Sequence, residues 1–447
     1  MKKIIKKILK GTFKLFRGIY RLIPLPARSK KRIKHFIIWT LDKSYASLAP
    51  GTMRRNNVYV ASHADKDRLL DIYEEYIDGI FQTGKKGEEF VEYKQHSISF
   101  SDEDVKPIVF YLPQFYTFSE NDKWWGKGFT EWTNVTKAVP QFPGHYQPHL
   151  PYDSAFYDQS KIETIKHQIK LAQNYGIYGF CFHYYWFNGK RLLEKPLDIL
   201  LNSEIDFPFC INWANENWTR RWDGHEDDIL MAQHYSPDDD LANITEICKY
   251  VRDKRYIRVN GKPLILIYRA NILPDANRTI QIWRDYCRKN GIGEVHLAAV
   301  ITHEFNPMIY NFDEAVVFPH HDVKTNPINT IEPISLDYNG WVHDMEEYIS
   351  NKRYYYDYNP YYGLFPSWDN TARRGNHFHL YKMNPALYKK WLSDILRHTK
   401  ENRDPGDRII FINAWNEWAE GAHLEPCRKY GHANLQATAD AVLDMKS

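Results

Sequence analysis

Glu417 and Glu420, in the stretch IIFINAWNEWAEGAHLEP (409–426), have the residue type and spacing of a catalytic pair. Carboxylates three residues apart lie on one face if the chain coils into a helical turn, with Cβ atoms roughly 5–6 Å apart. Two acids that close cannot ionise independently, so one can act as an acid and the other as a base. Retaining glycosidases need such a pair about 5–5.5 Å apart. The spacing predicts glycosidic-bond chemistry, and the alternative is a solvated acidic turn at a strand end.

Indole and amide side chains surround this pair. Asn416 and Trp418 flank Glu417 in the sequence. An indole face stacks on the apolar face of a sugar ring, and an amide hydrogen-bonds sugar hydroxyls with its donors and its acceptor. We therefore predict that Asn416 and Trp418 bind a sugar next to the catalytic glutamates.

Two further stretches carry tryptophans beside acids: WWGKGFTEWTNV (124–135) and WANENWTRRWDG (213–224). They are expected to form loops after the first and third strands. From them we predict as substrate-binding residues Trp125, Glu131, Trp132, Asn134, Trp213, Asn215, Glu216, Trp218, Arg220 and Asp223. Glu216 is the second candidate for a carboxylate that touches substrate. The alternatives are an aromatic loop plug and an Arg–Glu ion pair that only shapes its loop.

Eight strand-like apolar runs, separated by amphipathic helical runs, form the frame for these residues. The runs are 108–114, 178–183, 207–213, 264–269, 295–302, 315–319, 363–368 and 409–414. This alternation predicts an α/β fold of the (β/α)8 TIM barrel type, with its active site where the strands end. Helices are expected at 160–175, opened by a capping box of Ser160 and Glu163, and near 67–81, 239–254, 275–290, 341–350 and 384–400.

Polar and aromatic residues gather at the ends of these runs, whereas the starts show no comparable cluster. The predicted binding residues there are His183, Tyr184, Trp186, Asn212, Arg269, His303, His320, His321, Trp368 and Asp369. A metal site could be built from His303, His320, His321 and Asp322, but adjacent side chains on a strand point to opposite faces, which makes a shared ligand sphere awkward. We therefore predict that these residues hydrogen-bond sugar hydroxyls or a bridging anionic substituent, with no metal and no cofactor.

Charge is divided unevenly along the chain. The 447 residues carry a net charge of +3, yet residues 1–41 hold 13 Lys or Arg and no Asp or Glu, which leaves −10 on the rest. That body is not a nucleic-acid binder by charge.

A hydrophobic content of 43% suffices for one large core, and we predict a basic helical extension over 1–100 and the barrel over 101–447. The five cysteines lack a CxxC spacing and are predicted to be buried thiols in a reducing compartment.

Residues 2–23 place apolar side chains on one helical face and lysines and arginines on the other. This pattern is typical of a helix that lies in a membrane interface. Lysines interrupt the apolar core of about 7–15 residues that a secretory signal needs, and no run reaches the roughly 18 apolar residues of a spanning helix. We expect binding to an anionic membrane surface, with the protein cytoplasmic and peripheral at the inner face of the bacterial cytoplasmic membrane. The alternative is a frayed terminus or a helix docked on the body.

Five separated motifs resemble the WbsX family, which belongs with proteins similar to glycoside hydrolase family 99. They are FYLPQF, WWGKGFTEW, WANENWTRRWDG, WDNTAR and NAWNEWAEGAHLEP, within about residues 105–440. The resemblance implies a (β/α)8 barrel and a role in bacterial surface polysaccharide, including O-antigen and lipopolysaccharide. It gives Glu417 the role of the base that deprotonates the sugar 2-hydroxyl to form a 1,2-anhydro intermediate. Glu420 corresponds to the general acid and base on the leaving oxygen. The mannose specificity of family 99 is not implied, because the surrounding loops differ.

The sequence thus predicts a carbohydrate-active enzyme that cleaves or transfers a glycosidic bond of a bacterial surface polysaccharide or its lipid-linked precursor, with retention of configuration. Its expected partner is a glycan or lipid-linked oligosaccharide. One alternative is a sugar-nucleotide-dependent glycosyltransferase, as the family label says; against it, no Gly-rich phosphate loop of the Walker or dinucleotide type occurs in the sequence. A second alternative is a non-catalytic glycan-binding barrel, which would keep the tryptophans and lose the acids.

Overall fold

Eight parallel strands form the barrel. The computed structural model describes residues 66–82, 84–220, 225–301, 306–323, 325–328, 331, 333–334, 338–351, 354 and 356–446. The barrel strands are β1 (Lys106–Tyr111), β2 (Gly179–Phe187), β4 (Phe209–Trp213), β8 (Lys262–Ile267), β9 (His296–Ile301), β10 (Glu314–Val317), β12 (Gly363–Leu364) and β15 (Ile409–Ile412). They lie in the order β10-β9-β8-β4-β2-β1-β15-β12, and each neighbouring pair is parallel.

Tyr361 closes the barrel between β10 and β12. Its N–H donates to Ala315 O at 2.9 Å, and the Val317 N–H donates to Tyr361 O at 2.9 Å, as in a parallel pair. Gly363 then passes so close to β10 that a Cβ atom there would lie 2.1 Å from Val317 O. The strand order and this closure confirm the predicted (β/α)8 barrel.

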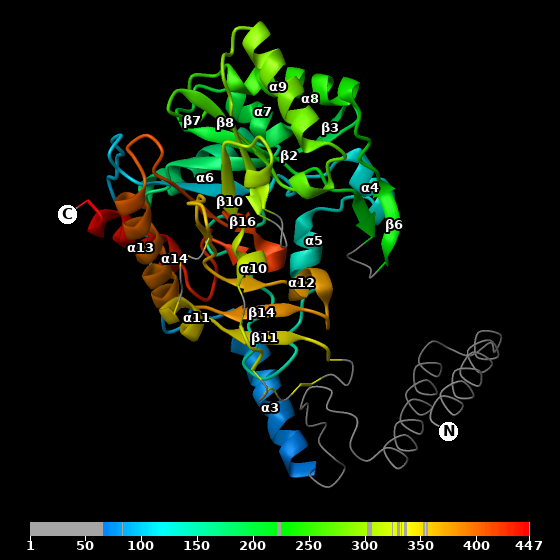
Figure 1. Cartoon of the computed structure of the whole chain (residues 1–447). Helices are drawn as coiled ribbons and strands as arrows, with labels where there is room; N and C mark the ends of the chain where they lie inside the picture. Colours follow the sequence, from blue (N-terminus) through cyan, green and yellow to red (C-terminus); the bar gives the residue numbers. More distant parts are fainter. Residues whose placement is uncertain are drawn as a thin grey trace, which may run out of the picture. The chain divides into compact units, whose positions relative to one another are not determined.

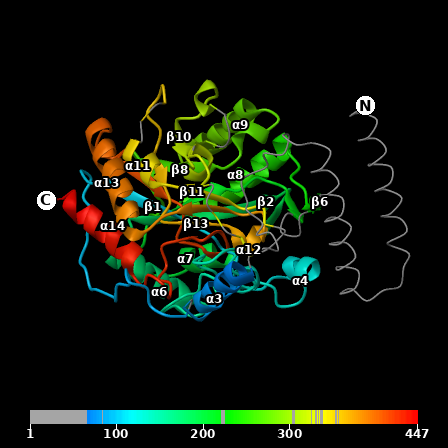
Figure 2. The same cartoon turned by 90° about the horizontal axis from the view of Figure 1, so that it is seen from below.

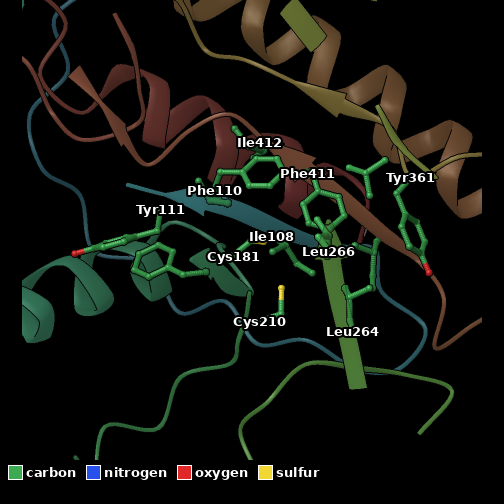
Figure 3. Packing of buried hydrophobic residues seen from close by; sticks show 14 of the residues in the cluster. Ile108, Phe110, Tyr111, Cys181, Cys210, Leu264, Leu266, Tyr361, Phe411 and Ile412 are labelled. Carbon is green, nitrogen blue, oxygen red and sulfur yellow. The ribbon is translucent and has the colours of Figure 1, made fainter. Parts of the chain in front are cut away.

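Apolar side chains fill the core of the barrel. Phe110 on β1 stacks on Phe411 on β15, with ring centroids 5.3 Å apart, and Figure 3 shows both rings among the aliphatic side chains of neighbouring strands. Strands covered on both faces read as continuous apolar runs, which is why the sequence reveals them. Cys181 and Cys210 are direct partners on β2 and β4, and all five cysteines are buried free thiols, as predicted.

Paired helices surround the barrel. They are α6 (Ile162–Asn174), α7 (Lys195–Leu201), α8 (Pro237–Val251), α9 (Ala276–Lys289), α13 (Pro385–Asn402) and α14 (Ala433–Asp444). In Figure 2, α13 and α14 lie on one side of the sheet, α8 and α9 on a second and α6 and α7 on a third. The predicted capping box of α6 is wrong, because the helix begins after Lys161 and no side chain caps it. The Ser160 N–H instead donates to Asp158 Oδ1 at 2.8 Å, so Ser160 belongs to the preceding turn.

The remaining elements are short. They are α4 (Ser119–Trp125), α5 (Glu131–Thr136), β3 (Lys190–Leu192), β5 (Trp218–Arg220), β6 (His225–Met231), β7 (Arg258–Val259), η2 (Ala270–Ile272), η3 (Pro307–Ile309), α10 (Pro319–Asp322), β11 (Trp341–Asp344), α11 (Glu346–Asn351), β13 (Trp368–Asp369), α12 (Thr371–Arg374), β14 (His379–Lys382), β16 (Asn416–Glu417), η4 (Trp418–Glu420) and β17 (Ala422–His423). β11, β14 and β13 form a separate three-stranded sheet, so the helix predicted at 341–350 is wrong in its first half. In Figure 1, α5 and α12 lie side by side, which brings loops after the first and seventh barrel strands together.

The segment before β1 packs on the barrel. α3 (Lys66–Gln82) is the helix predicted at 67–81, and after it Val91 forms a parallel bridge with Gly431. The His96 N–H donates to Asn174 Oδ1 at 2.8 Å, which attaches this segment to α6. The predicted membrane-binding segment 2–23 lies outside the described residues. Within the described part of the chain, no helix has the length and apolar content needed to cross a membrane.

Candidate active site

The two predicted catalytic glutamates lie on one turn after β15. Glu417 ends β16, and Glu420 ends the 3₁₀ turn η4, so the predicted helical turn is confirmed. Gly421 follows in the left-handed conformation, with a φ of 59°, and returns the chain to β17, which pairs antiparallel with β16. A Cβ atom on Gly421 would lie 2.8 Å from the Asp369 nitrogen, so a larger residue would displace Asp369.

Arg373 joins both glutamates to a third one. Its Nη2–H donates to Glu417 Oε2 at 2.8 Å, and its Nη1–H donates to Glu420 Oε1 at 2.5 Å. Its Nε–H donates to Glu131 Oε1 at 2.8 Å. Arg373 belongs to α12 and Glu131 opens α5, so three segments distant in sequence meet at one guanidinium group. The planar fork of donors fixes the orientation of the carboxylates.

The three carboxyl groups differ in exposure and in environment. The exposed fraction of the side chain is 0% for Glu131, 8% for Glu417 and 22% for Glu420. Burial raises the pKa of Glu417 to about 8; Arg373 opposes this rise, and the charges of Glu420 and Glu131 reinforce it. Burial disfavours the charged guanidinium of Arg373, but the three carboxylates outweigh it and raise its pKa. At neutral pH, Glu417 therefore holds a proton and Arg373 stays a cation.

Glu417 and Glu420 line a cavity of about 460 Å³ at the carboxyl ends of the barrel strands. Nine of the predicted residues line it: Trp125, His183, Glu216, Trp218, Arg269, His321, Trp368, Glu417 and Glu420. Glu216 and Arg269 form an ion pair on this wall, with Arg269 Nη1 2.5 Å from Glu216 Oε1. Burial and the charge of Arg373 lower the pKa of His183 to about 4, so its imidazole is neutral at pH 7.

Asn416 and Trp418 do not line the cavity but hold the turn that carries Glu417 and Glu420 from behind. The Leu112 N–H donates to Asn416 Oδ1 at 2.8 Å, and Asn416 Nδ2 donates to Leu112 O at 2.9 Å. The Trp418 indole donates to Glu425 Oε2 at 2.7 Å. The amide fixes the turn to the loop after β1, and the indole fixes it to a buried carboxyl group.

Three predicted residues of the first tryptophan-rich stretch also lie behind the cavity wall. The Trp132 indole donates to Tyr157 O at 2.9 Å, and its ring packs among other buried aromatic rings. Asn134 Nδ2 donates to Glu131 Oε2 at 3.3 Å. Glu131 reaches the site through Arg373 rather than through the cavity.

Five predicted residues at the ends of β2 and β4 are buried away from the cavity: Tyr184, Trp186, Asn212, Trp213 and Asn215. The Trp186 indole donates to Asp239 Oδ1 at 2.9 Å. Asn215 accepts from the Arg269 N–H at 2.8 Å and donates to Arg269 O at 3.0 Å. Asn215 therefore fixes the backbone of a residue that does line the cavity.

Asp369 lies behind α12, the helix that carries Arg373. Its Oδ1 accepts from the Thr371 N–H at 3.1 Å and from the Thr371 hydroxyl at 2.5 Å, at the start of that helix. Its Oδ2 accepts from Gln147 Nε2 at 2.7 Å and lies 2.8 Å from His145 Nε2. Burial alone would raise the pKa of Asp369, but His145 and the hydrogen bonds hold it at about 2. Asp369 is thus a fixed anion that orients α12.

Four predictions fall on residues that the structure does not describe in full. Asp223 and His303 lie outside the described residues, and the side chains of Arg220 and His320 are not described. Among the described residues, no group of three or more His, Cys, Asp or Glu side chains is arranged to hold a metal ion.

Sequence reasoning missed several lining residues, above all Arg373. The others include Asn121, Trp124, Tyr185, Tyr268, Phe318 and Arg374. Arg373 ends the WDNTAR motif, so its stretch was recognised but not its role. Nothing in the spacing shows that a residue after the seventh strand reaches acids that follow the first and eighth strands. Among the described residues, four tryptophans lie on the cavity wall, and they come from three different loops: Trp124, Trp125, Trp218 and Trp368.

The structure thus places a carboxyl pair and tryptophans on the wall of one cavity, at the carboxyl ends of the strands of a (β/α)8 barrel. The family model described as Glycosyltransferase WbsX matches residues 107–438, and the chain belongs to this family. The resemblance that the five motifs carry is therefore confirmed.

Two relatives from strains of Xanthomonas campestris pv. campestris, both named uncharacterized protein WxcX, are similar over nearly the whole chain. One is 40% identical over 439 residues and the other 41% identical over 440 residues. Each alignment covers 96% of this chain and 60% of the relative, so the chain spans about three fifths of the length of these relatives.

Solved structures are similar to this chain at low sequence identity. A glycoside hydrolase-like protein superposes with a TM-score of 0.50 and 14% identity, covering 79% of this chain and 98% of that protein. The GH99 endo-alpha-mannosidase from Bacteroides thetaiotaomicron has a TM-score of 0.46 and 16% identity, covering 78% of this chain and 98% of the mannosidase. The first likeness supports the fold.

Proposed function

We propose that the protein cleaves or transfers a glycosidic bond of a bacterial surface polysaccharide, of the O-antigen or lipopolysaccharide type, with Glu417 and Glu420 as the reacting carboxyl groups and with retention of configuration. The observation that carries this proposal is the position of both groups on the wall of a tryptophan-lined cavity, where Arg373 binds each of them. Membership of a family described as glycosyltransferases favours a sugar substrate.

The mechanism assigns one proton to the pair. In the first half, the Glu417 carboxylate takes the proton of the sugar 2-hydroxyl and O2 bonds to C1, while the bond from C1 to the leaving oxygen breaks and Glu420 protonates that oxygen. In the second half, Glu420 takes the proton of water or of an acceptor hydroxyl, whose oxygen bonds to C1. The bond from O2 to C1 breaks, and Glu417 returns its proton to O2. Each half inverts C1, so the product keeps its configuration.

The raised pKa of Glu417, about 8, fits this proton count. A pair that holds one proton at neutral pH has an acid and a base at the same time, and its two apparent pKa values belong to the pair. The proposed mechanism therefore requires this proton to move from Glu417 to Glu420 when the substrate binds. A carboxylate of raised pKa is also a stronger base toward a sugar hydroxyl than an ordinary glutamate.

The cavity wall supplies groups for binding sugar rings. Trp218 lies edge-to-face with Trp124, with centroids 5.7 Å apart, so the β5 hairpin and α4 hold each other's indoles in place. Trp368 lines the same cavity from β13. Aromatic faces of this kind bind sugar rings, and the Glu216–Arg269 ion pair offers both an acceptor and a donor for hydroxyls.

A panel of bacterial surface polysaccharides and lipid-linked oligosaccharides, incubated with the full chain and analysed by mass spectrometry, tests the proposal. We expect a defined product mass from one polysaccharide class, and no product with Glu417→Gln. Products that appear equally with Glu417→Gln would contradict the assignment.

A sugar-nucleotide-dependent glycosyltransferase is the second candidate, and the description of the family favours it. Calorimetric titration with a panel of sugar nucleotides distinguishes the two. Saturable binding, lost on mutation of a residue that lines the cavity, would support transfer from a nucleotide donor over chemistry on an existing glycosidic bond. A third reading, a glycan-binding barrel without catalysis, requires binding without any product from any sugar of the panel.

We further propose that residues 2–23 bind the protein to the inner face of the bacterial cytoplasmic membrane. The support is their separation of apolar and basic side chains. The full chain should sediment with vesicles that contain acidic lipid and should be released as salt rises, because charges separated by water are screened. Deletion of residues 2–23 should abolish sedimentation. Equal sedimentation with neutral vesicles would contradict the electrostatic part of this proposal.

A further inference from the structure

Glu131 is a buried acid that pairs with Arg373, the cation bound to Glu417 and Glu420, and does not itself line the cavity. Its side chain is 0% exposed, its Oε1 accepts from Arg373 Nε at 2.8 Å, and its Oε2 accepts from Asn134 at 3.3 Å. The Glu131 N–H donates to Gln114 O at 3.2 Å, which attaches α5 to the loop after β1. A carboxylate held in this way cannot react with a substrate. It is nevertheless linked to both reacting acids through the guanidinium group of Arg373.

We propose that Glu131 and Arg373 are positioning residues that set the number of protons on the Glu417–Glu420 pair: Arg373 holds the two reacting carboxyl groups next to each other, and Glu131 offsets the cation so that the pair keeps one proton. This inference rests on the proposed function, and it adds two residues that do not themselves exchange protons in the proposed reaction.

Charge counting in the buried cluster supports the inference. Three carboxylates and one guanidinium carry a net charge of −2 if every acid is ionised. That charge is costly away from water, so one acid takes up a proton. Without Glu131, Arg373 and two carboxylates would carry −1, and ionisation of both reacting acids would become easier. Without Arg373, it would become harder.

The other titratable groups that face Glu417 do not carry this effect. Tyr185 and His183 come from β2, Tyr268 follows β8, and burial keeps all three neutral at pH 7. Charged or titratable groups elsewhere on the cavity wall are Glu216, Arg269, His321 and Arg374. Glu216 and Arg269 pair with each other, so their charges offset.

Asp369 fixes the position of the cation in this arrangement. It accepts two hydrogen bonds from Thr371 at the start of α12, and Gly421 of the catalytic turn passes against its backbone. α12 and the catalytic turn are therefore positioned against the same residue. The distances from Arg373 to Glu417 and Glu420 are consequently set by the scaffold before substrate arrives.

The test is an infrared titration of the full chain without substrate, which follows the carbonyl band of protonated carboxyl groups. Part of this carbonyl band should be lost in Glu417→Gln or Glu420→Gln, and we assign that component to the Glu417–Glu420 pair. In Glu131→Gln, this component should disappear about one pH unit lower than in the wild type, because a like charge has been removed. In Arg373→Gln it should persist to a pH about one unit higher, because the opposite charge has been removed. The two shifts have opposite signs, which general loosening of the site would not produce.

Glu131→Asp is the matched control, because it keeps the charge and loses the fit. It should titrate like the wild type, whereas a purely structural role for Glu131 would make Glu131→Asp the more disruptive variant. Asp102→Asn removes an acid whose side chain is 95% exposed and should change nothing. Any one of three results would overturn the inference. The wild type could lack the band component of the Glu417–Glu420 pair, or the titration could be unchanged in Glu131→Gln. The third result is a pair of shifts with the same sign in Glu131→Gln and Arg373→Gln. If one variant does not fold, the sign in the other decides.

The titration is independent of turnover. Once a substrate is known, the alkaline limb of kcat/KM should shift to lower pH in Glu131→Gln by the amount seen in the infrared titration, with KM unchanged, because Glu131 does not touch the sugar. Opposite infrared shifts without turnover of any glycan would overturn the proposed function and leave the assignment of Glu131 and Arg373 intact. Glycan turnover with no infrared shift would overturn the assignment of Glu131 and Arg373 and leave the proposed function intact.

Discussion

Glu417 and Glu425 lie in one segment of chain, both are buried, and burial raises the pKa of each, to about 8 and about 7. Their surroundings differ. Glu425 accepts hydrogen bonds from Tyr157 and Trp418 on Oε2, at 2.6 and 2.7 Å. Its Oε1 accepts from Gln168 and Trp415 at 2.7 and 3.0 Å. Glu417 bonds to a guanidinium group and borders the cavity.

Under the proposed function, this difference separates a structural carboxyl group from a reacting one. Four donors from three parts of the chain use the oxygens of Glu425, which lies outside the cavity lining. Glu417 keeps access to the cavity, and its proton balance depends on Arg373 and Glu131. A raised pKa is therefore shared by both acids, and Glu417 is distinguished from Glu425 by its access to the cavity.

The largest expected effect is on turnover at Glu417 and Glu420. Glu417→Gln and Glu420→Gln should each lower kcat by about 10²–10⁴-fold and leave folding and glycan binding nearly intact, because glutamine keeps the shape and loses the proton chemistry. The double variant should be little worse than the poorer single one, since groups that act as a unit are not additive. Kinetics on the polysaccharide identified by the mass screen, with circular dichroism as the folding control, checks this prediction.

An activated aryl glycoside of the same sugar separates the two roles. Its leaving group needs no proton, so it should rescue cleavage in Glu420→Gln much more than in Glu417→Gln, and the product should keep its anomeric configuration. Inversion at the anomeric carbon, or wild-type rates in both variants, would direct the search to Glu216.

The second largest effect is on stability at Glu425. Glu425→Ala removes the acceptor of four buried donors and should lower the free energy of unfolding by about 3–5 kcal/mol. Urea unfolding measures this loss. Glu163→Ala on the exposed face of α6 is the control and should stay within about 0.5 kcal/mol of the wild type. Turnover per folded molecule should change far less in Glu425→Ala than in Glu417→Gln, and the opposite ranking would erase the contrast between the two acids.

The barrel could be predicted from sequence because its strands are covered on both faces. Runs such as 409–412 are apolar throughout, and the polar residues that follow them mark the face where sites form. The predicted catalytic turn follows from local spacing in the same way, since Glu417 and Glu420 are neighbours on one helical turn. Both predictions depend on patterns among residues that are close together in the sequence.

The rest of the site depends on contacts between distant segments. Arg373 meets Glu131 across 242 positions of sequence, and no local pattern specifies that pairing. Asn416 and Trp418 have the residue types of a sugar site, but their partners are Leu112 and Glu425, which only the fold brings near. Residue type and place along a strand therefore predicted which loops meet at the cavity, whereas the direction of each side chain required the structure.

A smaller effect is expected on acid stability, from the histidines beside the catalytic turn. Burial lowers the pKa of His149 to about 4 and of His423 to about 3, both below the ordinary value of 6.5. In the folded protein both histidines bind protons more weakly than they do in the unfolded chain. The stability that their neutral forms contribute is therefore complete above about pH 6.5 and is lost as pH falls toward 4. Each should cost about 2 kcal/mol of unfolding free energy between pH 7 and pH 5. Urea unfolding at both pH values should show this loss, and His423→Gln should reduce it.

The smallest expected effect is that of chelation. Arg373 occupies the position between Glu131, Glu417 and Glu420 that a divalent cation would need in order to bind those carboxylates. A second positive charge there would also lower the pKa of Glu417, whereas the proposed mechanism requires the pair to keep one proton. Prolonged EDTA treatment should therefore leave turnover of the full chain unchanged, and added Mg²⁺, Mn²⁺ or Zn²⁺ should not increase it. A loss of turnover that one of these ions restores would instead assign a ligand role to His303, His320 or His321, which lie in or after the fifth and sixth strand regions. The contrast between Glu417 and Glu425 would then be caused by a metal ion rather than by the guanidinium group of Arg373.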